Sequence, residues 1–321
     1  MSSNHRLYVS LPPYIHKGKT VSDIYRNYLI ALLPAIFASL YYFRAGALCV
    51  LVISVVVSVL TEYLLQKVLK REIQVSDCHA ILNGLILAFL LPPSSPWWMV
   101  TVGAFCSIAI GKQIFGELGN NPFNPPLIGW VMLRLSWPDK VSNWIEPVGG
   151  WVADPVLKIF KIDGIEAIHD LEFNILNLFL GRQAGGLGTI CALALLVGAI
   201  YLLWRRIISW HIPVSYLLTV FLFSLILYLS SRETQISPIY HLICGGTLLG
   251  AIFIATDPVS SPVTRWGKLA FGLICGVILM VIRTWGKYPD GTVFAILLAN
   301  TSAPLLNRLR PRSYGKGGKG A

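Results

Sequence analysis

The chain has 321 residues, of which 55% are hydrophobic and only 13% are charged, and its formal net charge is +11. A soluble domain carries about a quarter charged residues, so this composition lacks the polar surface that a soluble globule of this size needs. The basic residues lie in short clusters between apolar runs and in the tail. That spacing is typical of the ends of membrane spans and excludes a nucleic-acid-binding surface.

About ten apolar segments follow one another along the chain, and a full helical span needs about 20 residues. The first two are long enough to cross a bilayer or nearly so. The segments near 79–92 and 123–137 are shorter, and we expect half-helices of broken spans or flanking backbone that is buried in protein. The segments are predicted at 25–43, 45–66, 79–92, 97–111, 123–137, 187–204, 212–230, 240–256, 266–285 and 291–306.

The last five segments repeat the order of motifs in the first five. The run from His79 to Pro96 aligns without a gap with the run that starts at His241, and Asn-Pro and Tyr-Pro pairs at 121–122 and 288–289 each open a last apolar segment. Identity this weak could arise by chance, but the shared order favours an internal duplication. Because each copy has an odd number of segments, the second copy crosses the membrane in the opposite orientation. Most Lys/Arg clusters then lie on the same side of the membrane as both termini, and we expect that side to be the cytoplasm.

This topology divides the chain into five parts. We expect a cytoplasmic segment at 1–23, membrane repeats at 24–137 and 187–307, and a basic cytoplasmic tail at 308–321. The connection at 138–186 lies on the outer side and is too long for an ordinary turn. Within it, apolar residues at helical spacing over 165–180 predict an amphipathic helix that lies on the membrane surface.

Gly, Pro and Asn interrupt the chain at matching places in the two halves. Broken segments at corresponding positions of a duplicated membrane fold point to a central site. The alternative is that these Asn and Asp side chains cap half-helices and satisfy freed backbone groups. The candidates for a central pathway are Asn121, Asn124, Asp257, Asp290 and Asn300.

Glu62 is the clearest acidic residue within an apolar run. An intramembrane carboxylate is costly, so we add Glu62 to the pathway candidates. Lys67 follows it closely, which also allows a place near the membrane interface. The sequence contains no nucleophile elbow, P-loop, dinucleotide fingerprint or metal-ligand spacing, so no catalytic or metal-binding residue is predicted.

Several motifs resemble the RnfD/RsxD subunit of the Rnf electron-transport complex, which is related to the NqrB subunit of the sodium-pumping quinone reductase. The most specific is Asn-Pro-Phe-Asn-Pro at 121–125. Only the outer connection departs from the family pattern. The other matching motifs lie at 91–100, 111–119, 210–213, 250–251, 256–259, 288–291, 297–300, 304–305 and 310–312.

The resemblance implies a multi-pass subunit of a complex in the bacterial inner membrane, with other Rnf/Rsx subunits as partners. Such a complex moves electrons between ferredoxin and NAD(H), or toward a redox regulator, coupled to ion movement. The chain would be part of this translocase without holding a complete active site. The implied fold is an all-α bundle of two inverted five-segment repeats, similar to urea transporters. A stand-alone transporter or channel of the same fold, and a purely structural subunit, stay open as alternatives.

Family members usually carry FMN attached through a phosphoester to a threonine in the outer connection. Here Asp154 stands at the corresponding position, in Val-Ala-Asp-Pro-Val-Leu at 152–157. A carboxylate cannot form that phosphoester, and its charge would oppose a nearby phosphate. We therefore predict no covalent FMN, while a flavin bound without a covalent link, FMN or riboflavin, stays open.

Overall fold

A computed structural model describes residues 20–71, 73–116, 119–147, 150–170, 174–231 and 235–308. Within these ranges the chain folds into helices and loops, and the one β-type pairing described is an isolated antiparallel bridge between Ile145 and Val152. The predicted all-α class is therefore confirmed. Most of the predicted N-terminal segment and basic tail lies outside the described residues.

The first half contains α1 (Val21–Val68), α2 (His79–Leu90), α3 (Trp97–Ala109) and α4 (Pro125–Ser136). Helix α1 begins with a capping box, in which Thr20 and Asp23 bond to each other's backbone amides. Arg44 interrupts α1 with φ 48° and ψ −123°, so the two segments predicted at 25–43 and 45–66 are separate helices joined at Arg44. The short 3₁₀ helices η1 (Val75–Asp77) and η2 (Gln113–Phe115) follow α1 and α3.

The outer connection contains three short helices, α5 (Pro138–Val141), α6 (Val156–Asp170) and α7 (Ile175–Leu180). The single helix predicted over 165–180 is wrong. Asn174 has an extended backbone, and its side chain accepts a hydrogen bond from the amide of Leu176, so a new helix starts there. Helix α6 starts earlier than predicted and bends at Gly164, where φ is 85°. Residues 171–173 of the prediction lie outside the described ranges.

The second half contains α8 (Ala192–Trp204), α9 (His211–Ser230), α12 (Arg265–Thr284) and α13 (Thr292–Leu306). Between α9 and α12 the chain forms three short pieces, α10 (Pro238–Ile243), α11 (Thr247–Leu249) and the π-helical η3 (Gly250–Ile254). Gly245 separates the first two pieces with φ 73°. The segment predicted as one apolar run at 240–256 is therefore interrupted.

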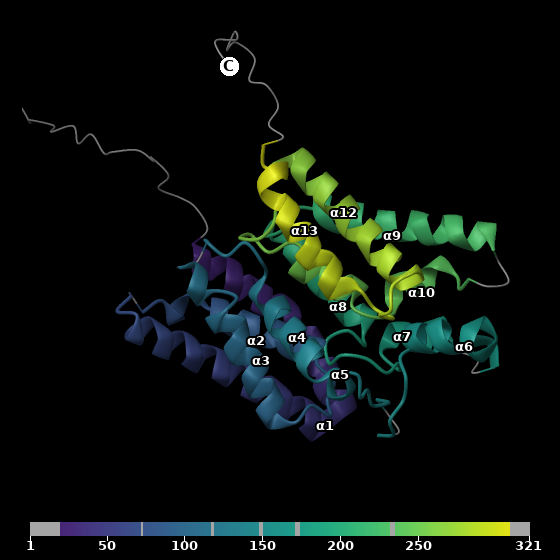
Figure 1. Cartoon of the computed structure of the whole chain (residues 1–321), viewed down its shortest axis with the longest axis horizontal. Helices are drawn as coiled ribbons and strands as arrows, with labels where there is room; N and C mark the ends of the chain where they lie inside the picture. Colours follow the sequence, from purple (N-terminus) through teal and green to yellow (C-terminus); the bar gives the residue numbers. More distant parts are fainter. Residues whose placement is uncertain are drawn as a thin grey trace, which may run out of the picture.

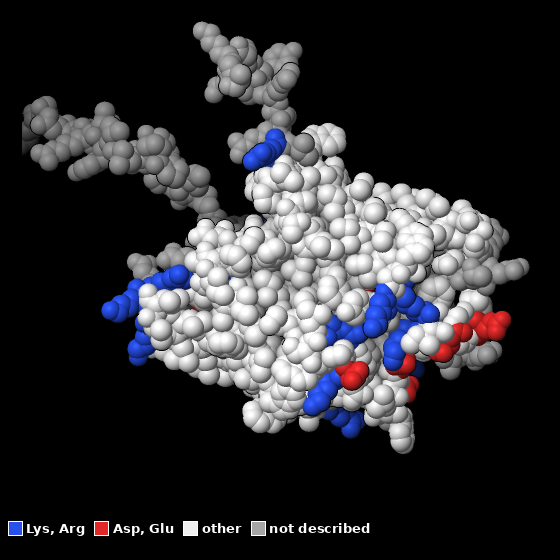
Figure 2. All heavy atoms as spheres, in the orientation of Figure 1, with Lys and Arg blue, Asp and Glu red and all other residues white. Residues whose placement is uncertain are grey.

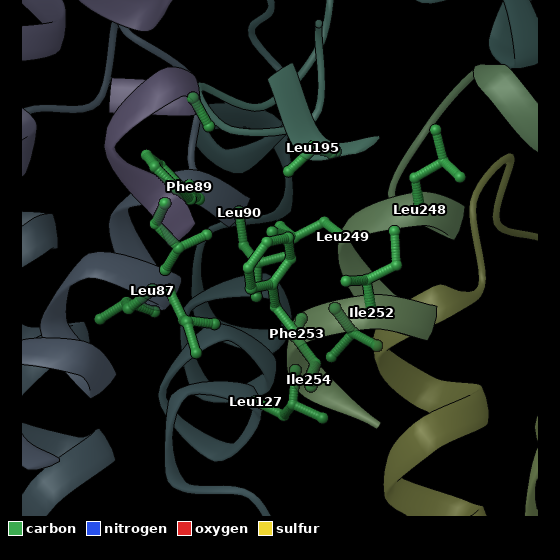
Figure 3. Close-up of a cluster of buried hydrophobic side chains, with 14 of the residues drawn as sticks. Leu87, Phe89, Leu90, Leu127, Leu195, Leu248, Leu249, Ile252, Phe253 and Ile254 are labelled. Atoms are coloured by element: carbon green, nitrogen blue, oxygen red, sulfur yellow. The ribbon is translucent and has the colours of Figure 1, made fainter. Parts of the chain in front are cut away.

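The two halves share one apolar core. Figure 3 shows Leu87 and Phe89 of α2 and Leu127 of α4 facing Leu249 and Phe253 of the second half, and all five are fully or almost fully buried. Figure 1 shows α1–α4 grouped on one side and α9, α12 and α13 on the other, with α6 and α7 at one end. The two groups meet where α8 packs against α1 and where α13 packs against α4.

The surface has the distribution of a membrane protein. Among the described residues, four helices are long and apolar enough to span a bilayer: α1, α9, α12 and the run Trp97–Phe115, which includes α3. Figure 2 shows a broad zone without Lys, Arg, Asp or Glu, with charged side chains gathered at the left end, at the top and along the lower right. The chain is therefore an integral membrane protein, and the crossing of all ten segments remains a prediction.

Gly198 should be essential for the packing of α8 against α1. A Cβ at this position would lie 2.2 Å from the backbone oxygen of Ala31, which cannot move aside without shifting α1. We expect Gly198→Ala to lower the unfolding temperature of the purified protein in detergent, with a cost of about 1–3 kcal/mol typical of overpacking. Val197→Ala changes an exposed neighbour on the same helix and is the control. Equal unfolding temperatures for the two variants would contradict this packing.

Candidate functional site

An ion pair between Arg283 and Asp290 holds the interrupted segment of the second half. Arg283 lies in the last turn of α12, where its side chain is 2% exposed, and its Nη2 lies 3.0 Å from Asp290 Oδ1. The same Asp290 oxygen accepts hydrogen bonds from the amide and hydroxyl of Thr292, at 3.2 and 2.7 Å, and so caps α13. Asp290 Oδ2 accepts from the amide of Gly246 at 2.6 Å. One carboxylate therefore links α12, α13 and the glycine break.

The other donors of Arg283 reach the break itself. Nη1 donates to the backbone oxygen of His241 at 2.6 Å, and Nη2 donates to Thr247 Oγ1 at 2.7 Å. An interrupted helix leaves carbonyl groups without their helical partners, and in an apolar environment each needs another donor. Arg283 supplies that donor for the end of α10.

Lys161 of α6 ties the outer connection to the same place. Its Nζ donates to the backbone oxygens of Ile282, Arg283 and Tyr288 at 3.1, 2.8 and 3.0 Å. A cation is favourable at the C-terminal end of a helix such as α12. Burial lowers the pKa of Lys161, and the nearby Arg283 lowers it further.

A cavity of 290 Å³ opens beside this ion pair, between the outer connection and both halves. Basic and aromatic side chains surround it, and Gly245 and Gly246 form part of its wall. A Cβ at Gly245 would lie 2.7 Å from Asp290 Oδ2, so a larger residue would disturb the wall. The lining includes the basic residues Arg134, Lys158, Lys161 and Lys287 and the aromatic residues Trp130, Trp144 and Tyr288.

This lining suits an aromatic ligand that carries negative charge. Flat apolar and aromatic walls bind a planar ring, and convergent cations bind an anionic group. Arg134 already lies over the ring of Tyr288, 5.3 Å from its centroid. Asp154 is not among the lining residues, but Pro155 next to it is. Asp154 forms an ion pair at 2.6 Å with Lys158, one of the cavity's cations.

The remaining amide and acid candidates make mostly local bonds. Asn121 Nδ2 donates to the oxygen of Phe123 at 3.0 Å, and Asp257 Oδ2 accepts from the amide and hydroxyl of Ser260 at 3.1 and 2.9 Å. These bonds are of the kind expected from residues that stabilise turns and helix ends. Their part in an ion pathway stays a prediction.

Asn124 joins the two halves. It stands at the N-cap position of α4 without forming a side-chain cap bond, and its Nδ2 donates to the oxygen of Ile254 in η3 at 3.4 Å. Its Oδ1 has no hydrogen-bond partner among the described residues, and neither do the two side-chain polar atoms of Asn300 in α13. The structure therefore brings Asn124 to the interrupted second half.

Glu62 belongs to a different cluster. It is fully buried on α1, and its Oε1 lies 2.7 Å from Lys112 Nζ. Sequence reasoning did not single out Lys112, Arg283 or Lys161. The first two were detectable as cations within or at the edge of apolar segments, where charge is costly. Lys161 lies in a polar stretch and carried no such signal.

Removal of Arg283 should destabilise the protein strongly. Arg283→Met leaves the carbonyl of His241 without its donor and Asp290 without its counter-ion, so we expect a loss of about 3 kcal/mol or more. Thermal unfolding of the purified protein in detergent measures this loss. Lys287→Met is the matched control, because Lys287 is an exposed cation in the same connection. A similar unfolding temperature for both variants would show that the ion pair is dispensable.

Comparison with known proteins identifies the family. The NQR2, RnfD, RnfE family matches residues 8–315. A protein of Mannheimia succiniciproducens, named as the D subunit of an ion-translocating oxidoreductase complex, is 38% identical over 345 residues, covering 96% of this chain and 97% of its own length. Proteins with the same name from Salmonella typhi and Escherichia coli K12 are 38% and 37% identical, and each alignment covers 96% of this chain and 98% of the relative. The chain therefore belongs to the NQR2, RnfD, RnfE family.

Proposed function

We propose that this chain is the membrane-embedded D subunit of an Rnf-type ion-translocating oxidoreductase complex. The observation that carries the proposal is the match along almost the whole chain to relatives with that name. The chain then works with the other subunits of the complex, which moves electrons between ferredoxin and NAD(H), or toward a redox regulator, coupled to ion movement. Among its described residues, no group of three or more His, Cys, Asp or Glu side chains is placed to hold a metal ion.

The cavity beside Arg283 and Asp290 is the place we propose for a flavin held without a covalent bond. Trp144 and Tyr288 could flank the ring, and Lys287 and Lys158 could meet an anionic group. A volume of 290 Å³ lies at the small end of ligand pockets, so the cavity would enclose part of a flavin. A bound flavin would accept and pass on electrons. Asp154 would hold Lys158 in place instead of carrying the cofactor.

Intact mass tests the proposed absence of covalent FMN. The denatured chain should have the mass of the unmodified polypeptide, because Asp154 cannot form the phosphoester. Any flavin should appear in the supernatant, detected by absorbance and fluorescence. A relative whose outer connection carries the attachment threonine is the positive control. A mass excess that corresponds to one attached FMN would overturn the proposal.

We also propose that all ten segments cross or enter a bacterial inner membrane as two inverted repeats, in a urea-transporter-like bundle. The break at Arg44, which separates the first two segments, supports this arrangement. Both termini and the connections near residues 70 and 206 would be cytoplasmic, and the connection containing α6 would lie outside.

Reporter fusions test this topology. Alkaline phosphatase should be active when fused after residue 147 and inactive after residues 70, 206 and 308, because it folds only on the outer side. A fluorescent protein that folds only in the cytoplasm, fused at the same points, is the control and should give the opposite pattern. Phosphatase activity after residue 206 would contradict the inversion of the second half.

The alternatives are a stand-alone transporter and a structural subunit without a redox part. Purification in mild detergent distinguishes a stand-alone transporter from a subunit of a complex. A subunit should purify together with its partners, whereas a transporter would appear as a lone oligomer. Reduction and reoxidation of a flavin released from this chain would separate a redox subunit from a scaffold.

A further inference from the structure

A second cavity, of 590 Å³, lies where α1 is interrupted, between that break and the outer connection. Its volume falls within the range of ligand pockets, and it shares no lining residue with the cavity beside Arg283. Residues on both sides of the break, the turn before α6 and the residue that follows the end of α7 surround it. The lining includes Tyr41, Tyr42, Arg44, Glu146 and Arg182.

Arg44 has a backbone conformation for which glycine is the favoured residue. Its φ of 48° and ψ of −123° are close to those of the first central residue of a type II′ turn. A residue with a Cβ is strained in this conformation, and strained residues cluster at functional sites. Since a glycine would form the break more easily, the turn itself does not explain the arginine. A role for its guanidinium group does.

Tyr42 holds a second arginine beside the break. Its hydroxyl donates to the backbone oxygen of Leu180 at 3.1 Å, at the end of α7. Its ring lies so close to Gly181 that a Cβ on this glycine would be 2.9 Å from Tyr42 Cε2. Arg182 follows directly, so this contact places it at the same cavity as Arg44.

The two arginines lack acceptors. Within the described part of the chain, no hydrogen bond or ion pair involves the side chain of Arg44 or Arg182, and both residues are exposed. Glu146 also lines the cavity, but it forms no ion pair with either arginine among the described residues. Two guanidinium groups and one carboxylate give the lining a net charge of +1. An anion is therefore the ligand that this lining favours.

The cavity adjoins an apolar surface of α1. The part of α1 that precedes the break is about 35 Å long at 1.5 Å per residue, enough to cross a bilayer, so the break lies near the membrane surface. Tyr41 is 78% exposed, as expected of a tyrosine at that level. Phe37, one turn earlier on the same face, is 66% exposed, and Leu48, just beyond the break, is 51% exposed. Acyl chains have an apolar surface to contact here.

We propose that this cavity binds the phosphodiester headgroup of an anionic phospholipid, with Arg44 and Arg182 as the groups that bind the phosphate. The planar guanidinium group matches the geometry of phosphate oxygens and forms two parallel hydrogen bonds with them. One negative charge neutralises the lining, whereas a zwitterionic headgroup leaves its charge unchanged. Free phosphate has the same chemistry, but the exposed apolar side chains beside the cavity favour a lipid. The site is independent of the proposed redox function and of the proposed flavin.

The strain at Arg44 separates a binding role from a structural one. Arg44→Gly removes the guanidinium group and also removes the steric cost of the positive φ. The unfolding temperature of this variant in detergent should equal or exceed that of the unaltered protein, while its binding of lipid falls. An arginine that only supported the fold would give a lower unfolding temperature.

Photo-cross-linking tests the site. The chain, purified in mild detergent together with the subunits that accompany it, is mixed with phosphatidylglycerol that carries a photoreactive group next to its headgroup. Mass spectrometry of the digested chain should find the cross-link within residues 41–46 or next to Arg182. Unlabelled phosphatidylglycerol should compete for this cross-link, phosphatidylethanolamine should compete at least tenfold more weakly, and inorganic phosphate at the same concentration should not compete.

The variants predict the direction of each change. Arg44→Gly and Arg182→Gln should each lower the affinity for phosphatidylglycerol about tenfold, the loss expected for one charge-assisted hydrogen bond. Glu146→Gln should raise the affinity, because it removes a negative charge from the lining. Lys140→Gln is the matched control, since it removes an exposed cation of the outer connection that does not line the cavity. Its cross-linking should equal that of the unaltered protein.

Three results would overturn the proposal. The first is undiminished cross-linking at these residues in a folded Arg44→Gly/Arg182→Gln variant. The second is competition by phosphatidylethanolamine as strong as that by phosphatidylglycerol. The third is competition by inorganic phosphate at the same concentration, which would assign the cavity to a free phosphate. None of these results bears on whether the chain is a subunit of a redox complex.

Discussion

The backbone break between α10 and α11 leaves carbonyl groups for which the outer end of the second half must supply hydrogen-bond donors. A helix that stops within an apolar environment leaves carbonyl groups that water cannot reach. Arg283 donates to this break, Asp290 balances Arg283 and caps α13, and Lys161 donates to the end of α12. Lys161 thereby holds α6, and with it the cavity, beside the residue that satisfies the interrupted helix.

The two ion pairs differ in how fully their carboxylates are hydrogen-bonded. Both oxygens of Asp290 are used, by Arg283, Thr292 and Gly246, and that pair carries no net charge. In the group formed by Glu62, Asp77 and Lys112, Glu62 Oε2 has no hydrogen-bond partner among the described residues, and Asp77 Oδ2 lies 3.8 Å from Lys112 Nζ. The fully bonded carboxylate of Asp290 makes the first pair the more rigid link, between α12, α13 and the glycine break.

Hydropathy predicted the positions of the helices because burial in lipid depends on composition over about 20 residues. The spacing of apolar residues wrongly predicted one helix over 165–180. That spacing does not reveal that Asn174 caps a new helix or that Gly164 bends the first one. Asn124 was found from the repeat, but its bond to Ile254 depends on the packing of the two halves. The partners of Lys161 lie more than a hundred residues away, so no local pattern could identify them.

The partners of the cavity's cations also limit what kind of flavin it would hold. Lys158 is paired with Asp154, Lys161 donates to three carbonyls, and Arg134 donates to the oxygen of Pro138. A phosphate would have to compete with these acceptors, and Asp154 adds negative charge at the rim. Aromatic walls, in contrast, need no such exchange to bind a ring. Asp154 thus weakens the Lys158 side of the proposed flavin site for a phosphate.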